Sequence, residues 1–425
     1  MNKDDHELLA PTTRGTPMGE LLRRFWTPAL LSREVEADGA PVRVRLMGED
    51  LIAFRDSKGR VGLLDEHCAH RGASLYFGKN TDCGLRCWYH GWKYDVDGNC
   101  LDQPNEPPQT QFKDRVKQTA YPCIERNGAV WAYLGPRETM PPLHDLEWTT
   151  LPPSHVHVAK RIQQCHWTQG LEGDIDSSHL GFLHSHATPL AVSPTAGVPT
   201  RTGSFDNTPR FELMTSRSGI VQASVRDAGP NEDYWRVGQW FMPGFTTIPP
   251  RGGDAPLHGH SWTAMEDGKS VVFTFSWHPA RPLRDDEIER METATNFHVH
   301  LIPGTFDPRA NRANDYAPDS PPAAQPWMRV KYFQDQDIGA TESMGALYDR
   351  TQENLGNTDL VIVRVRKRLV DAARDLQRGI EPAGREPQDY RLRPVSMMLP
   401  KKINSWSEAV AEPMDARPGT YREGI

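Results

Sequence analysis

Two short segments of the sequence each pair a cysteine with a histidine. Cys68 and His70 are followed, after 16 residues, by Cys87 and His90. Two thiolates and two imidazoles suit a [2Fe–2S] cluster in which histidines replace two cysteines on one iron, which raises the reduction potential. A tetrahedral zinc ion is the alternative, although zinc sites more often pair Cys-x₂₋₄-Cys with His-x₃₋₅-His. The spacing therefore favours the iron–sulfur cluster.

A second pattern places His179 and His184 five residues apart, after a group of acidic residues. Two histidines and one carboxylate, with open positions left over, hold iron in non-haem Fe(II) oxygenases. On an ideal helix residues five apart differ by about 140°, so these two share a metal only if the helix bulges or ends near Gly181. Asp176 and His179, three apart, lie on one helix face. Alone, the pattern also fits an ordinary helix with solvated or buried histidines.

The carboxylate ligand has to come from a distant part of the chain, and the residue types do not select it. The acidic candidates are Asp335, Asp337, Glu342, Asp349 and Asp359. Asp359 precedes a strongly amphipathic segment, so it is also explained as a carboxylate that complements a helix N-terminus.

The segments that position the first pattern have the character of short strands. They are separated by turn residues and follow a predicted helix at Pro17–Trp26. Between residues 40 and 135 the β-type runs are Val42–Leu46, Leu51–Phe54, Val61–Leu64, Lys93–Val96 and Ala129–Leu134. They predict a small antiparallel β domain.

A proline-rich connector at residues 138–154 marks the expected domain boundary. We expect domains at 1–145 and 146–425, the second being an α+β catalytic domain with a central antiparallel sheet flanked by helices. Its predicted elements are a helical stretch near 165–186, strands at Phe211–Leu213, Tyr234–Phe241 and Val271–Trp277, and a long helix at Leu360–Leu376.

Composition narrows the class of protein. The 425 residues carry a net charge of −7 without a basic block, so neither nucleic acid nor a membrane surface is an expected partner. No apolar run approaches the roughly 20 residues of a membrane span, and the N-terminus lacks a signal peptide. We therefore expect a soluble, cytoplasmic protein. The remaining cysteines are expected to be reduced thiols; they are Cys83, Cys100, Cys123 and Cys165.

The first pattern resembles the Rieske proteins in ligand order, in spacing and in the neighbouring Gly72 and Trp92. Respiratory-chain Rieske proteins carry a disulfide cysteine in each loop, where this chain has Ala73 and Tyr89. The resemblance is therefore to the Rieske domain of oxygenases and their ferredoxins.

The string Glu-x₃-Asp-x₂-His-x₄-His, which begins at Glu172, resembles the mononuclear-iron motif of Rieske non-haem iron oxygenases. The chain is similar to the phthalate dioxygenase-like branch over nearly its full length. That resemblance implies that His179, His184 and Asp359 hold the iron, and that Asp176 links one of them to a Rieske histidine of a neighbouring subunit. It also implies a homotrimer or a pair of trimers, supplied by an NAD(P)H-dependent reductase directly or through a ferredoxin.

Members of this branch act on aromatic acids, so the expected function is that of a terminal oxygenase component. The expected reaction is ring dihydroxylation or oxidative O-demethylation of a phthalate-like or methoxylated, lignin-type aromatic acid. Arg201 and Arg236 are candidates for binding a substrate carboxylate, with structural ion pairing as the alternative. The chain departs from the branch pattern at Asp174 and around Trp262. The rival function is a Rieske electron-transfer protein with a vestigial second metal site.

Overall fold

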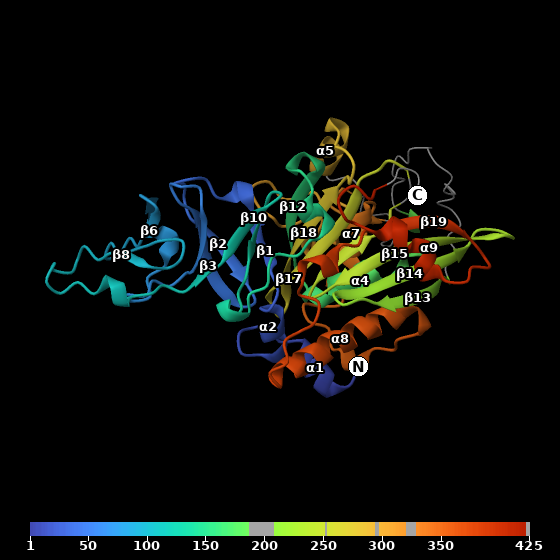
Figure 1. Cartoon of the computed structure of the whole chain (residues 1–425), viewed down its shortest axis with the longest axis horizontal. Coiled ribbons are helices and arrows are strands. Elements are labelled where there is room, and N and C mark those ends of the chain that lie inside the picture. Colours follow the sequence, from blue (N-terminus) through green and yellow to red (C-terminus); the bar gives the residue numbers. More distant parts are fainter. Residues whose placement is uncertain (187–207, 251–252, 294–296, 320–328, 422–425) are drawn as a thin grey trace.

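The structure is a computed structural model that describes residues 1–186, 208–250, 253–293, 297–319 and 329–421. The molecule is elongated, with small β-sheets at its narrow end and one large sheet at its broad end (Figure 1). The predicted α+β class, with an N-terminal β domain and a larger α+β domain, is confirmed.

Three small antiparallel sheets build the N-terminal part. In β2 the side chains of Val44 and Leu46 point inward and those of Arg43 and Arg45 outward, the alternation of a half-buried strand. The sheets are β1–β11–β10 (Thr27–Leu31, Ala129–Ala132, Cys123–Arg126), β2–β3–β4–β9 (Val42–Leu46, Glu49–Arg55, Val61–Asp65, Ala120–Tyr121) and β5–β6–β7–β8 (Lys79–Thr81, Gly84–Arg86, Lys93–Tyr94, Cys100–Asp102).

The large antiparallel sheet has the order β12–β18–β17–β16–β15–β14–β13, and β19 pairs with β15. Its central strands are buried along nearly their whole length, because helices and the N-terminal part cover it. The strands are β12 Val156–Gln163, β13 Arg210–Thr215, β14 Gly219–Asp227, β15 Glu232–Phe241, β16 Phe245–Ile248, β17 Leu257–Glu266, β18 Lys269–Trp277 and β19 Val395–Pro400.

Two helices matter most for the position of the second metal site. α4 (Trp167–Ile175) and α7 (Phe333–Ser343) pack against each other beside the large sheet (Figure 1). The long helix α8 (Leu360–Gln377) lies outside α4 and contacts α1 (Lys3–Leu9) and α2 (Pro17–Leu22). The other α-helices described are α3 Glu147–Thr150, α5 Asp285–Glu292 and α9 Trp406–Met414.

One hydrophobic core joins the two parts of the chain. Trp131 of β11 stacks on Phe275 of β18 with ring centroids 5.9 Å apart, and Trp148 stacks on the same phenylalanine at 5.2 Å. The turn after β2 also donates backbone hydrogen bonds to β17, from Met47 N to Ala264 O and from Gly48 N to Met265 O, both 2.8 Å. Because the core continues across residue 145, the boundary at 145/146 stays a prediction.

In the part of the chain that the structure describes, no helix combines the length and the apolar character needed to cross a bilayer.

Candidate metal centres

The two Cys/His segments form matching loops at the narrow end of the molecule. Each loop is closed by two backbone hydrogen bonds: Cys68 N to Ala73 O and Gly72 N to Cys68 O in the first, and Cys87 N to Trp92 O and Gly91 N to Cys87 O in the second. Gly72 and Gly91 have φ values of 75° and 76°, a left-handed conformation that favours glycine. The local sequence therefore explains why both loops turn tightly beside their ligands.

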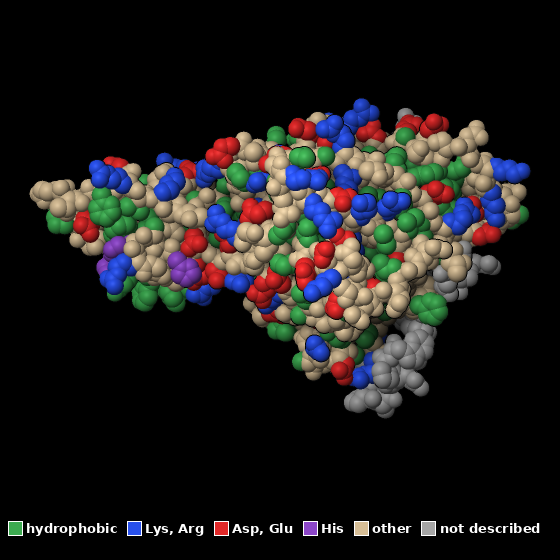
Figure 2. Space-filling model, turned by 90° about the horizontal axis from the view of Figure 1, so that it is seen from below, with side chains coloured by type: hydrophobic (Ala, Val, Ile, Leu, Met, Phe, Trp, Pro, Cys, Tyr) green, Lys and Arg blue, Asp and Glu red, His purple; other side chains and the backbone are tan. Residues whose placement is uncertain are grey.

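The four candidate ligands differ in depth: the two thiols are buried, and the two imidazoles lie nearer the surface. Cys68 and Cys87 are each 3% exposed, whereas the rings of His70 and His90 are half-buried and lie 4.6 Å apart. Histidine side chains are visible at the surface of this end, beside apolar side chains (Figure 2). Two buried thiols beneath a pair of imidazoles fit a cluster with sulfur ligands on one iron and nitrogen ligands on the other.

Hydrogen bonding also fits a thiolate environment. The Tyr94 hydroxyl lies 3.2 Å from Cys68 Sγ, and hydrogen bonds from the Cys87 thiol and from Tyr94 lower the pKa of Cys68. The His70 ring stacks on Trp92 at 4.2 Å, which fixes the orientation of one imidazole.

The second site begins where α4 ends. The helix stops at Ile175, and Asp176 is its C-cap. His179 and His184 follow on two 3₁₀ turns, His179–Gly181 and Leu183–His186. Residues five apart on a continuous helix would point in different directions. Here the helix ends before both histidines, so the two side chains can face the same point.

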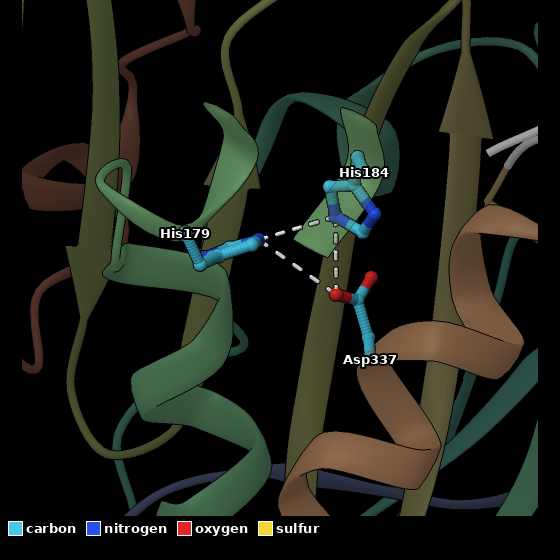
Figure 3. Close-up of side chains that lie close together, drawn as sticks. All are labelled: His179, His184 and Asp337. Atoms are coloured by element: carbon cyan, nitrogen blue, oxygen red, sulfur yellow. Dashed lines mark hydrogen bonds and ion pairs between the residues drawn. The ribbon is translucent and has the colours of Figure 1, made fainter. Parts of the chain in front are cut away.

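His179 and His184 converge with Asp337 of α7 (Figure 3). The two Nε2 atoms are 3.2 Å apart, and Asp337 Oδ1 lies 3.2 Å from His184 Nε2 and 3.7 Å from His179 Nε2. Two imidazoles and one carboxylate that face a common point are the donor set of a non-haem iron site with open positions. The residues present thus fit a mononuclear iron.

The structure brings Asp337, and not the expected Asp359, together with His179 and His184. The Asp359 carboxylate instead accepts a hydrogen bond of 2.6 Å from Gly356 N at the start of α8. A sequence signal for α7 did exist: Phe333–Ser343 forms a helix whose buried residues are mostly polar, which is unusual for a helix packed in a core.

Neighbouring side chains orient both imidazoles. His184 Nδ1 lies 2.8 Å from Gln336 Oε1, and its ring stacks on Phe333 at 3.6 Å. His179 Nδ1 lies 3.6 Å from Asp176 Oδ2. Partners on both Nδ1 atoms leave both Nε2 atoms for the metal, as is usual around protein-bound metals.

Ser178 holds the side chain of Asp176 in place. Asp176 Oδ1 accepts hydrogen bonds from Ser178 N at 2.7 Å and Ser178 Oγ at 2.6 Å. Burial disfavours the charged forms of Asp176 and His179, yet their contact outweighs it: the pKa of Asp176 is lowered and that of His179 is raised. The structure therefore supports a charged Asp176 beside the site.

Two departures from the branch pattern contact each other. Buried Asp174 accepts hydrogen bonds from Trp262 Nε1 at 2.6 Å, from His260 Nδ1 at 2.8 Å and from Thr246 Oγ1 at 2.6 Å. These bonds attach the last turn of α4 to β16 and β17. Sequence reasoning missed this role, because the partners are more than 70 residues away from Asp174.

Arg201 lies outside the described residues. Arg236, on β15, donates to Pro249 O at 3.0 Å, and its Nε is buried without a hydrogen-bond partner. Its cross-strand neighbour Ser224 accepts a hydrogen bond from Ser177, just after α4, so Arg236 is on the sheet face nearer the iron site. Among the described residues, no carboxylate is found as a partner of Arg236, and burial lowers its pKa.

Comparisons with known proteins identify both parts of the chain. Residues 25–118 match the Rieske [2Fe–2S] domain, and residues 132–417 match the family described as LigXa C-terminal domain like. Together these matches cover most of the chain and include both candidate metal centres.

Characterised relatives are similar over nearly the whole chain. The 3-chlorobenzoate-3,4-dioxygenase oxygenase subunit of Comamonas testosteroni is 33% identical, over 95% of this chain and 96% of the relative. The phthalate 4,5-dioxygenase oxygenase subunit of Pseudomonas putida is 33% identical, over 98% and 94%. The 5,5'-dehydrodivanillate O-demethylase oxygenase subunit of a Sphingobium strain is 30% identical, over 90% and 82%.

Solved structures share the fold at lower identity. Pseudomonas putida CBB5 NdmA, in a mutant with caffeine, has a TM-score of 0.59 at 18% identity, over 92% of this chain and 100% of that chain. The oxygenase in a carbazole-bound complex with the ferredoxin of carbazole 1,9a-dioxygenase has a TM-score of 0.57 at 21% identity, over 87% and 94%. The chain belongs to the Rieske non-haem iron oxygenases, as an alpha subunit of the phthalate dioxygenase-like branch, and is an O₂-incorporating oxidoreductase with a [2Fe–2S] cluster and a mononuclear iron.

Proposed function

We propose that the chain oxidises an aromatic carboxylic acid, by ring dihydroxylation or oxidative O-demethylation. The electrons come from an NAD(P)H-dependent reductase, either directly or through a ferredoxin. We infer an acid substrate from Arg236, a cation on the active-site face of the sheet. No carboxylate among the described residues pairs with it. Relatives named for chlorobenzoate, phthalate and dehydrodivanillate support both reaction types.

The proposed cluster ligands are Cys68, His70, Cys87 and His90, and the proposed iron ligands are His179, His184 and Asp337. When bound, the cluster supplies single electrons and the mononuclear iron supplies the activation of O₂. The protein contributes the remaining parts: it orients the imidazoles, holds the substrate and limits the access of water.

Arg236 has an energetic reason to bind an anion. Arg236 is half-buried, and a partly desolvated cation without a counter-charge is costly. A carboxylate neutralises it while accepting two parallel hydrogen bonds from the guanidinium. A substrate carboxylate would therefore supply the counter-charge that Arg236 lacks among the described residues.

Asp176 is the proposed link between the two metal centres. Its side chain is 23% exposed and contacts His179, whereas the Rieske loops lie at the far end of the elongated chain (Figure 1). A link between the sites therefore requires the Rieske end of a second subunit to approach Asp176. Repeating that head-to-tail contact closes a ring, which supports a homotrimer or a pair of trimers.

The test measures the holoenzyme with a compatible reductase and compares benzoate with benzamide, which lacks the negative charge. Arg236→Gln should raise the KM for benzoate at least tenfold and leave the KM for benzamide nearly unchanged. The control is Arg210→Gln, which removes an exposed arginine of β13 that pairs with Asp233 of β15. An unchanged KM for benzoate in Arg236→Gln would overturn the assignment of an acid substrate.

A further inference from the structure

The carboxylate of Asp174 accepts three hydrogen bonds on a single oxygen atom. Its Oδ2 is 2.6 Å from Thr246 Oγ1, 2.8 Å from His260 Nδ1 and 2.6 Å from Trp262 Nε1. Burial disfavours a charged carboxylate, but His260 and the hydrogen bonds outweigh burial and lower the pKa of Asp174. A charged carboxylate forms stronger hydrogen bonds than a neutral group, so Asp174 attaches the end of α4 firmly.

The three donors belong to one patch of the large sheet. Thr246 of β16 pairs directly with His260 of β17, and Trp262 is two residues further along β17. Paired residues, and residues two apart in a strand, share a face of the sheet. All three side chains are at most 5% exposed, so water cannot easily replace Asp174. A movement of the end of α4 would therefore leave buried donors without an acceptor, which is costly.

Trp262 also fits closely against the backbone of α4. Gly170 lies one helical turn before Asp174, on the same face of the helix. A Cβ atom at Gly170 would lie 2.0 Å from a ring carbon of Trp262, so the indole occupies the space that a larger residue would need. The guanidinium of Arg161 lies over the indole, 5.4 Å from the ring centroid, in a favourable cation–π arrangement. The glycine and the indole together set the distance between α4 and β17.

The last turn of α4 carries Asp176 as well as Asp174. Asp176 N donates to Glu172 O at 3.0 Å and to Gly173 O at 3.3 Å, so the backbone of Asp176 is part of that turn. The Asp176 carboxylate lies 3.6 Å from His179 Nδ1, at the upper limit of hydrogen-bond length. A displacement of the turn by a fraction of an ångström therefore decides whether this contact closes or opens.

We propose that Asp174 is a positioning residue for electron transfer between the two metal centres. Its three hydrogen bonds hold the end of α4 at the place where Asp176 meets His179. The inference rests on the proposed function, in which Asp176 links the centres. Asp174 acts through the helix end rather than on a metal or on the substrate. Loss of one of its donors should therefore slow the passage of electrons to the iron site and leave both metal centres in place.

Two tryptophans provide a matched pair for the test. Trp262 Nε1 donates to Asp174, and Trp277 Nε1 donates to the carboxylate of Glu147 at 2.8 Å. Both indoles are buried. Trp277 is on the opposite face of the sheet, because its paired residue Leu257 is five positions from Trp262 along β17. Replacement of either tryptophan by phenylalanine removes one hydrogen bond to a carboxylate and keeps an aromatic ring.

The test is a single turnover of holoenzyme whose cluster has been reduced with dithionite. The protein is mixed with O₂ and 4-methoxybenzoate, and reoxidation of the cluster is followed by its absorbance. Trp262→Phe should slow reoxidation about tenfold or more, since small displacements have large effects on rate, whereas Trp277→Phe should react at the wild-type rate. Both variants should keep about three iron atoms per chain and the cluster spectrum. Urea denaturation should show similar losses of stability, so that stability alone does not explain the difference.

Thr246→Val removes another donor to the same oxygen and replaces Trp262→Phe if that variant fails to fold. Equal reoxidation rates in Trp262→Phe and Trp277→Phe would overturn the inference, and so would loss of iron from Trp262→Phe. Asp176→Asn separates this result from a failure of the proposed function. Reoxidation of Asp176→Asn at the wild-type rate would count against the link itself, whereas slow reoxidation in Asp176→Asn alone would count only against the role of Asp174.

Discussion

The two metal centres differ in how far their side chains are separated along the sequence. The proposed cluster ligands come from two loops within 23 residues, so residue types and spacing were enough to propose them. The spacing also pointed to His179 and His184, whose rings converge in the structure. The third proposed ligand, Asp337, was not predictable from spacing, because it reaches the two histidines only when α7 packs against α4.

Replacing the carboxylates separately tests the choice between them. Asp337→Ala removes one of three ligands, so iron should fall from about three to about two atoms per chain, while the visible spectrum of the cluster is retained. Asp359→Ala, the matched control at the start of α8, should keep about three. Metal analysis together with the absorbance spectrum distinguishes the two, and loss of iron in the Asp359 variant alone would restore the original assignment.

The Tyr94 hydroxyl tests the environment of the cluster. A hydrogen bond to a ligand sulfur stabilises the more negative, reduced state. Tyr94→Phe should therefore lower the reduction potential by about 40 mV, the equivalent of roughly 1 kcal/mol for one electron. Tyr133→Phe, at another fully buried tyrosine, serves as the control. A potential that is unchanged in a redox titration of Tyr94→Phe would argue against this hydrogen bond.

At the scale of elements, α4 carries Asp176 at its end and is anchored on two sides. Asp174 bonds to β16 and β17, and Glu172 forms a bidentate ion pair of 2.7 Å with Arg366 of α8. The sequence predicted α8 and its buried stripe correctly, because periodicity is a local property. It did not predict the ion pairs, because α8 follows α4 by almost 200 residues.

Arg366 and Lys367 provide a matched pair for testing that anchor. Arg366 is buried and also pairs with Glu353, whereas Lys367 makes an exposed i, i+4 pair with Asp371. Arg366→Met removes the shared partner of two half-buried carboxylates and leaves Glu172 with only a 3.8 Å contact to Arg350, so it should cost about 3 kcal/mol. Lys367→Met should cost less than about 0.5 kcal/mol. Urea denaturation measures both, and equal effects would mean that the buried pair does not anchor α4.

At the scale of the whole molecule, a shared hydrophobic core joins the N-terminal and C-terminal parts. His144 illustrates this core, because its ring lies against Phe25 of the N-terminal part at 6.1 Å and against Phe245 of β16 at 5.5 Å. The proline-rich connector predicted a separation at this place. Composition did not reveal the core that spans it, since the contacts are made between residues far apart in sequence.

His144 also makes a prediction about acid stability. Burial lowers its pKa to about 3, whereas in the unfolded chain it binds a proton below about 6.5. The unfolded state therefore gains protons first, and stability is lost as the pH falls from about 6.5 towards 3. His144→Phe should reduce the loss of stability between pH 7.5 and pH 5 by about 2 kcal/mol. Denaturation curves at both pH values test this, and an identical loss in both proteins would refute it.

The central claim is that electrons stored at Cys68, His70, Cys87 and His90 are used at the site of His179, His184 and Asp337. The most direct measurement is a single turnover, in which chemically reduced protein is mixed with O₂ and 4-methoxybenzoate while cluster absorbance and oxidised product are followed. In the wild-type protein the cluster should reoxidise as product forms. Asp337→Ala should reduce normally, reoxidise at least a hundredfold more slowly and form no product; product formation at the wild-type rate in that variant would contradict the account.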